Sequence, residues 1–160
     1  MSAPATAERL LQILNQGVEH ANALLSALRD EHDALQQRSA SAIEAALEQK
    51  IQRLAVFEKH EVERRALLKA LQVTDSRQAV DGFIAAQPAH ASTLRQRWNQ
   101  LLKLADECRN QNQLNGALVD TQRRHVQRAL DILSGTPETA TYGPSGATDR
   151  RSGSHTLAKA

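Results

Sequence analysis

Histidine and cysteine are the side chains of this 160-residue chain best suited to metal binding or nucleophilic chemistry. The six His residues show no H-x-x-x-H, H-E-x-x-H or E-x-x-H arrangement, the spacings that place metal ligands on one helix face. His32 lies on an apolar seam, where a ligand or a pH switch is conceivable. A half-buried, hydrogen-bonded core histidine is the favoured interpretation. We therefore predict no metal site and no cofactor.

The single cysteine, Cys108, lies between Ala105 and Asn112 on another apolar seam, which favours a packed, inert thiol over a nucleophile. One Cys also excludes an intrachain disulfide and fits a reducing compartment. The sequence contains no G-x-G-x-x-G, G-x-x-x-x-G-K or G-x-S-x-G motif, so it offers neither a phosphate-binding loop nor a nucleophile elbow. We predict that the protein is not an enzyme.

Two arginine clusters are candidates for nucleic-acid binding: Arg64 with Arg65, and Arg123, Arg124 and Arg128. Against that reading, the formal net charge is only +2 and the chain has just two Phe, one Trp and one Tyr. A phosphate-binding track needs a larger basic surplus and, for single strands, interleaved aromatic rings. Solvated helix faces with cations near a helix C-terminus are favoured. A weak nucleic-acid binder stays an alternative, and no nucleic-acid partner is predicted.

The elements that carry these residues are helical. Apolar residues recur at spacings of three and four between residues 6 and 134, a stretch with three Gly and one Pro, whereas the last 26 residues hold four Gly and two Pro. Ala and Leu dominate the apolar content, which suits close helix packing. We predict an all-α fold: an elongated antiparallel bundle or coiled coil of three long helices plus one short helix. The predicted domains are a helical domain, 1–134, and a flexible, disordered C-terminal tail, 135–160.

The expected helices cover about 6–37, 41–72, 77–86 and 88–133. Thr6, Ser41 with Glu44, and Asp75 occupy cap positions for the first three, and Pro88 is acceptable in the first turn of the last. At ~1.5 Å per residue the last helix measures roughly 68 Å against roughly 48 Å for each of the other long helices. It must therefore overhang, bend or find another partner.

A polar stretch interrupts the apolar seam in the middle of the last helix. Asn112, Asn115 and Gly116 lie on or beside the seam, although a Gly there costs ~1 kcal/mol relative to Ala. The favoured explanation is structural: a buried amide fixes the helix register, and Gly permits close helix approach. The functional alternative is that this part of the seam faces a partner.

The tail contains the only tyrosine. Tyr142, Gly143, Pro144 and Gly146 form a segment that cannot continue a helix. An isolated aromatic of this kind is either accidental or a short peptide ligand, since aromatic anchors dominate many interfaces.

These two motifs together resemble a known family. The pattern Cys108-x-x-x-Asn112-x-x-Asn115-Gly116, the helix after it, and the tail Tyr142-Gly143-Pro144-x-Gly146 are similar to those of the FlgN-type flagellar export chaperones. The resemblance implies a cytosolic, non-enzymatic chaperone for the hook-filament junction proteins, also called hook-associated proteins. It further implies delivery of these substrates to the flagellar type III export apparatus, with the C-terminal helix binding the substrate and the tail Tyr docking to the cytoplasmic domain of the export gate.

The predicted sites follow from this resemblance and from the length of the last helix. Substrate-protein binding is predicted at Asn112, Asn115, Val119, Val126, Leu130 and Leu133, and export-gate docking at Tyr142, Gly143, Pro144 and Gly146. We expect a cytoplasmic protein without stable membrane insertion, because the chain shows neither a signal peptide nor an apolar run of ~20 residues. A helical scaffold that self-associates through the surplus seam is the alternative.

Overall fold

The computed structural model describes residues 3–134, and its four elements are all α-helices. In chain order they are α1 (Ala3–Gln37), α2 (Ala40–Ala70), α3 (Arg77–Ala85) and α4 (Ala91–Leu133). The described residues contain no strand, and the predicted all-α fold is confirmed. The chain divides into two units, Met1–Thr121 and Gln122–Ala160. The predicted tail, 135–160, lies outside the described residues.

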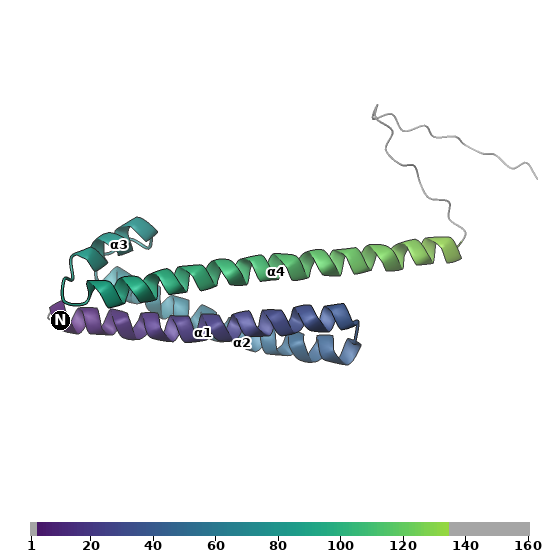
Figure 1. Cartoon of the computed structure of the whole chain (residues 1–160), viewed down its shortest axis with the longest axis horizontal. Helices are drawn as coiled ribbons and strands as arrows, with labels where there is room; N and C mark the ends of the chain where they lie inside the picture. Colours follow the sequence, from purple (N-terminus) through teal and green to yellow (C-terminus); the bar gives the residue numbers. More distant parts are fainter. Residues whose placement is uncertain (1–2, 135–160) are drawn as a thin grey trace, which may run out of the picture. The chain divides into compact units, whose positions relative to one another are not determined.

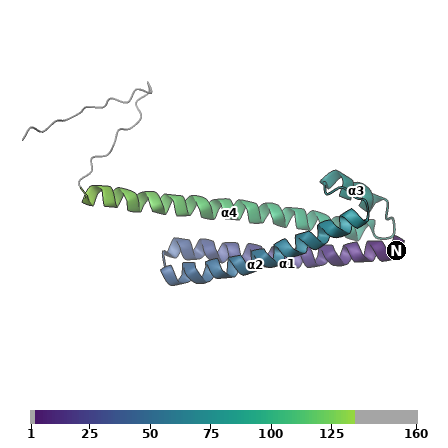
Figure 2. The ribbon, with the colours of Figure 1, turned by 180° about the vertical axis from the view of Figure 1, so that it is seen from behind.

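The first unit is built on an antiparallel hairpin of α1 and α2, with the first part of α4 beside α1 (Figure 1, Figure 2). Only Arg38 and Ser39 separate the two hairpin helices, and Arg38 adopts a positive φ of 54° that reverses the chain. A connection this short forces consecutive helices to be antiparallel neighbours. α4 runs in the same direction as α1.

α1 is the central helix of this unit, because it packs against both of the other long helices. Lys50 of α2 contacts it at Glu31, and Cys108 of α4 contacts it at Ala21. Its buried apolar residues are Ala7, Leu10, Ile13, Leu14, Val18, Ala21, Leu24, Leu25, Ala27, Leu28, Ala34 and Leu35. This set is wider than one stripe of apolar residues at spacings of three and four, because a helix with two packed sides buries more than one stripe.

The helix starts differ from the predicted ones. Thr6 lies inside α1, which already begins at Ala3. Ser39, not Ser41, caps α2, and its hydroxyl accepts a hydrogen bond from the backbone N–H of Ala42 at 3.4 Å. Both serines precede the same apolar pattern, and Ser39 takes the cap because the α1–α2 turn gives it the extended backbone that an N-cap needs.

The junctions around α3 also correct two predictions. Ser76, not Asp75, caps α3, with its hydroxyl 3.2 Å from the backbone N of Ala79. Pro88 does not start α4; it lies in a turn closed by the hydrogen bond from the N–H of His90 to the carbonyl of Gln87 at 2.9 Å. Proline suits the second position of such a turn because its φ is already fixed there.

Asp75 is available to another partner, the buried Arg64. The guanidinium of Arg64 donates to Asp75 at 2.9 Å and to Glu61 at 3.0 Å, and it lies 5.6 Å from the ring centroid of Trp98. Burial by itself would lower the pKa of Arg64, but the hydrogen bonds to the two carboxylates raise it above its usual value. Arg64 therefore ties α2 to the α2–α3 loop, and it is not exposed for phosphate binding.

α2 buries only some of the apolar residues that recur along it at spacings of three and four. Its buried residues are Ala46, His60, Arg64 and Leu68. Leu47, Ile51, Leu54 and Val62 keep 41, 59, 40 and 65% of their surface exposed. α2 packs along α1 on one line, and within the described residues no further helix covers these side chains.

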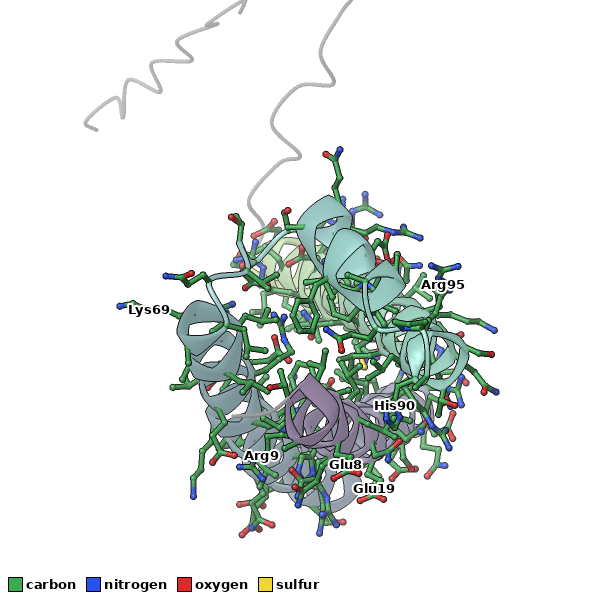
Figure 3. The ribbon with its side chains drawn as sticks, turned by 90° about the vertical axis from the view of Figure 1, so that its left-hand side faces the viewer. Glu8, Arg9, Glu19, Lys69, His90 and Arg95 are labelled. Atoms are coloured by element: carbon green, nitrogen blue, oxygen red, sulfur yellow. The ribbon has the colours of Figure 1, made fainter. Side chains whose placement is uncertain are left out.

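Charged side chains surround the outside of the helices. Glu8, Arg9, Glu19, Lys69 and Arg95 are exposed and point away from the centre in the end-on view of Figure 3. None of the described helices has a stretch long and apolar enough to span a membrane.

At Gly17, side chains of α2 and α4 approach the backbone of α1 closely. A Cβ at this position would lie 2.8 Å from Nε2 of His60 and 3.2 Å from Cδ2 of Leu101. The His60 ring is 3% exposed and stands edge-on to His20, with 5.4 Å between ring centroids. Burial lowers the pKa of His60, so this ring is packed in its neutral form.

We predict that Gly17→Ala lowers the free energy of unfolding by about 1–3 kcal/mol, because the new methyl group displaces a packed ring and a core leucine. Gly82→Ala in α3 is the matched control, since a Cβ there meets nothing within 4 Å. Urea unfolding of both variants checks this. Equal stabilisation by the two substitutions would show that the α1–α2 contact at Gly17 is not tight.

Candidate functional site

Cys108 is a packed thiol, as predicted. It is 8% exposed, and its Sγ donates to the carbonyl oxygen of Ala21 at 3.6 Å. Burial, and then the negative charge of Glu107, raise the pKa of Cys108, which keeps the thiol protonated and poorly nucleophilic at neutral pH. Between residues 3 and 134 no three His, Cys, Asp or Glu side chains gather as metal ligands would.

The three long helices meet at a polar contact around Asn115. Its amide nitrogen donates to the carbonyl of Leu28 at 2.8 Å and to the carboxylate of Glu31 at 2.8 Å. The other oxygen of Glu31 accepts from Nζ of Lys50 at 2.6 Å. We call Asn115, Glu31 and Lys50 the polar clamp, because they belong to α4, α1 and α2 respectively.

His32 completes the surroundings of the clamp. Its Nδ1 lies 3.0 Å from Oδ1 of Asn115, and its Nε2 lies 3.0 Å from the amide nitrogen of Gln36. The ring is half-buried, so the predicted hydrogen-bonded core histidine is confirmed. The predicted buried amide is confirmed as well, with Asn115 only 2% exposed.

Gly116 does not play the structural role favoured by the sequence. A Cβ built there meets no atom within 4 Å, so within the described chain no helix uses this glycine for close approach. Asn112, four residues earlier, is also exposed. The structure thus separates the motif into a buried amide that holds α4 and an open pair, Asn112 and Gly116, on the outside.

A groove lies beside this open pair. We call it the α2–α4 groove, and its volume is near 320 Å³. Its lining residues are Leu24 and Leu28 from α1, Lys50 and Leu54 from α2, and Cys108, Arg109 and Asn112 from α4. Leucines from two helices make the groove apolar, and the charged residues that line it are cations.

The remaining predicted binding residues are exposed on α4. Val119, in the first unit, is 46% exposed. In the second unit Val126, Leu130 and Leu133 are 60, 53 and 83% exposed. With Asn112 these four residues follow spacings of three, four or seven and therefore share one face of the helix. We call Val119, Val126, Leu130 and Leu133 the α4 stripe.

Sequence reasoning missed the contribution of α2 to the exposed apolar surface. The helical spacing of Leu47, Ile51 and Leu54 is typical of a packed face, yet each is at least 40% exposed. No sequence signal distinguishes the two outcomes, because the same spacing describes a covered and an uncovered stripe. The predicted docking residues Tyr142, Gly143, Pro144 and Gly146 lie outside the described residues.

We predict that Asn115→Ala lowers the free energy of unfolding by about 1–3 kcal/mol, because it removes a donor from a buried carboxylate. Asn112→Ala, at an exposed position of the same helix, should change it by less than about 0.5 kcal/mol. Thermal or urea unfolding of the pair measures the difference. Equal effects would mean that the clamp does not hold α4 in place.

Comparison with known proteins identifies the family of this chain. The chain matches no curated protein and no solved structure. A family model described as FlgN protein matches residues 1–150, a range that includes the helices, the Asn112–Gly116 motif and the Tyr142–Gly146 segment. The resemblance drawn from those motifs is confirmed: the chain belongs to the FlgN family, a family of flagellar export chaperones.

Proposed function

We propose that this protein is a cytoplasmic chaperone that binds hook-associated proteins through the α4 stripe and delivers them to the flagellar type III export apparatus. The observation that carries the proposal is the exposure of the stripe. Its residues are apolar at helical spacing, and all four keep at least 46% of their surface exposed. In a chain of the FlgN family, such a face is a ready surface for an export substrate.

The chemistry of the stripe suits a helical, aggregation-prone segment of the substrate. An amphipathic helix can lay its own apolar face along residues spaced by three and four. Burying each Val or Leu side chain removes apolar area from water and is worth roughly 1.5–3 kcal/mol. The same contact covers the apolar face of the substrate, which prevents premature association with other chains. Shielding of this kind needs no reactive group.

Delivery is assigned to the segment Tyr142–Gly146. Family membership supports this assignment, because the matched region includes the segment. The tyrosine ring can bury ~150–250 Å² in a partner pocket, and the adjacent glycine and proline disfavour a helix there. Tyr142 would thus act as a short linear ligand for the cytoplasmic domain of the export gate, separate from the substrate-binding stripe.

We predict that Leu130→Asp weakens binding of a purified hook-associated protein at least about tenfold, the affinity equivalent of one buried leucine. Arg128→Asp is the matched control, since position 128 lies on the opposite face of α4. Isothermal titration calorimetry measures both affinities, and circular dichroism measures helix content. Unchanged affinity in Leu130→Asp would remove the stripe from the binding site.

The same variant tests the self-associating scaffold. Analytical ultracentrifugation of the wild-type chain without substrate should show a single, concentration-independent species. A dimer that Leu130→Asp converts to monomer would instead assign the stripe to contact between two copies of this chain.

We predict that Tyr142→Ala separates binding from delivery. Substrate affinity and thermal stability should be unchanged, while secretion of the hook-associated proteins falls as an aromatic anchor worth roughly 2 kcal/mol or more is lost. Calorimetry and secretion assays in cells carrying the variant check the two halves. Normal secretion would exclude Tyr142 from delivery, and a parallel loss of affinity would place it in the substrate site.

A further inference from the structure

Gly116 has no role within the described chain, although its position is costly. Glycine in a helix interior is unfavourable relative to alanine, and here the missing Cβ leaves open space instead of admitting a neighbouring helix. Gly17 shows the contrast, because its neighbours already approach to 2.8 and 3.2 Å of a Cβ position. A binding partner can therefore approach the backbone of α4 closely at Gly116.

The α2–α4 groove lies on the same side of α4 as Gly116. Asn112 lines the groove, Gly116 follows it by four residues and Val119 follows Gly116 by three, so the three share one side of α4. On the α2 side Leu54 lines the groove, and Ile51, three residues away on the same face, is 59% exposed. All of these residues belong to the first unit.

The position of the groove between helices suits a further helix. It is bounded by α1, α2 and α4, and a further helix laid between α2 and α4 would complete a four-helix bundle. Packed helix axes lie about 8–10 Å apart, and the shorter distances need small residues at the crossing. Gly116 supplies such a residue on α4.

The charge of the lining specifies the occupant further. Its two ionisable side chains, apart from the buried Cys108, are Lys50 and Arg109. Lys50 is held by Glu31 in the clamp. Among the residues that the structure describes, Arg109 pairs only with Asp106, and both side chains of that pair are 68% exposed. An exposed pair of this kind contributes little, so a carboxylate on an incoming helix can replace Asp106 at low cost.

We propose that the α2–α4 groove and Gly116 seat an amphipathic helix of the export substrate, which places a small residue against Gly116 and an acidic residue beside Arg109. This inference rests on the proposed function and deepens it: the substrate contacts the first unit as well as the α4 stripe. The expected substrate segment is a helix whose apolar face includes Ala, Gly or Ser, with Asp or Glu beside that face.

Substitution of Gly116 tests the seat, because it separates binding from stability. Gly116→Leu fills the approach point, and Ala117→Leu adds the same side chain at an exposed position that is turned about 100° from Gly116 around α4. We expect Gly116→Leu to weaken binding of a purified hook-associated protein at least about tenfold, and Ala117→Leu to change it less than about twofold. Gly116→Ala should raise the melting temperature, since alanine favours helix and its Cβ meets nothing, yet still weaken binding.

The failure of this inference and the failure of the proposed function give different binding results. If the wild-type chain binds the substrate and Gly116→Leu binds it equally well, this inference alone is wrong. No binding by the wild-type chain overturns the proposed function and the seat with it. Arg109→Glu should weaken binding in low salt more than in high salt. An effect that does not depend on salt would show that no acidic residue of the substrate lies beside Arg109. A substrate-free dimer that Gly116→Leu dissociates would show that a second copy of the chain occupies the groove.

Discussion

The hydrogen bonds between Asn115 and α1 determine how α4 lies on the helical hairpin. From its start to Cys108, α4 is held in place by buried apolar side chains. After Cys108, Asn115 is the single buried residue in the described part of α4. A buried amide and carboxylate must both find partners, and they do so in one register only. Sliding or rotating α4 would leave the carboxylate of Glu31, 7% exposed, without the amide donor. The clamp therefore sets which side of α4 faces outward.

That rotation explains the distribution of the apolar surface. With Asn115 turned toward α1, Asn112 lines the α2–α4 groove and Gly116 follows it by one turn on the same side of α4. On α2, Leu54, which is 40% exposed, lines the other wall. Two long helices packed against α1 leave this side open, because a closed bundle needs a fourth helix. The structure thus keeps an apolar surface ready without unfolding any element, which lowers the ordering cost of binding.

The end of α4 stays helical although its apolar residues are uncovered. Residues 122–133 consist mainly of good helix formers such as Gln, Arg, Ala and Leu, and the side chains of Gln127 and Asp131 hydrogen-bond one turn apart at 2.9 Å. Local propensity thus replaces tertiary packing there. A preformed helix presents its stripe in a fixed pattern, as a chaperone that recognises helical segments requires.

The sequence by itself determined the helices, their order and the family, because helical spacing, Gly and Pro breakers and the two motifs are local properties of the chain. It also identified Cys108 and His32 as core residues, since a residue on an apolar seam is usually buried. The caps at Ser39 and Ser76 were missed because neighbouring residues have equal capping chemistry, and only the path of the turn selects one. The separation of Asn115 from Gly116, and the exposure of Leu47, Ile51 and Leu54, were decided by tertiary structure. Periodicity states which residues share a helix face, whereas the number and rotation of the packed helices decide whether that face is covered.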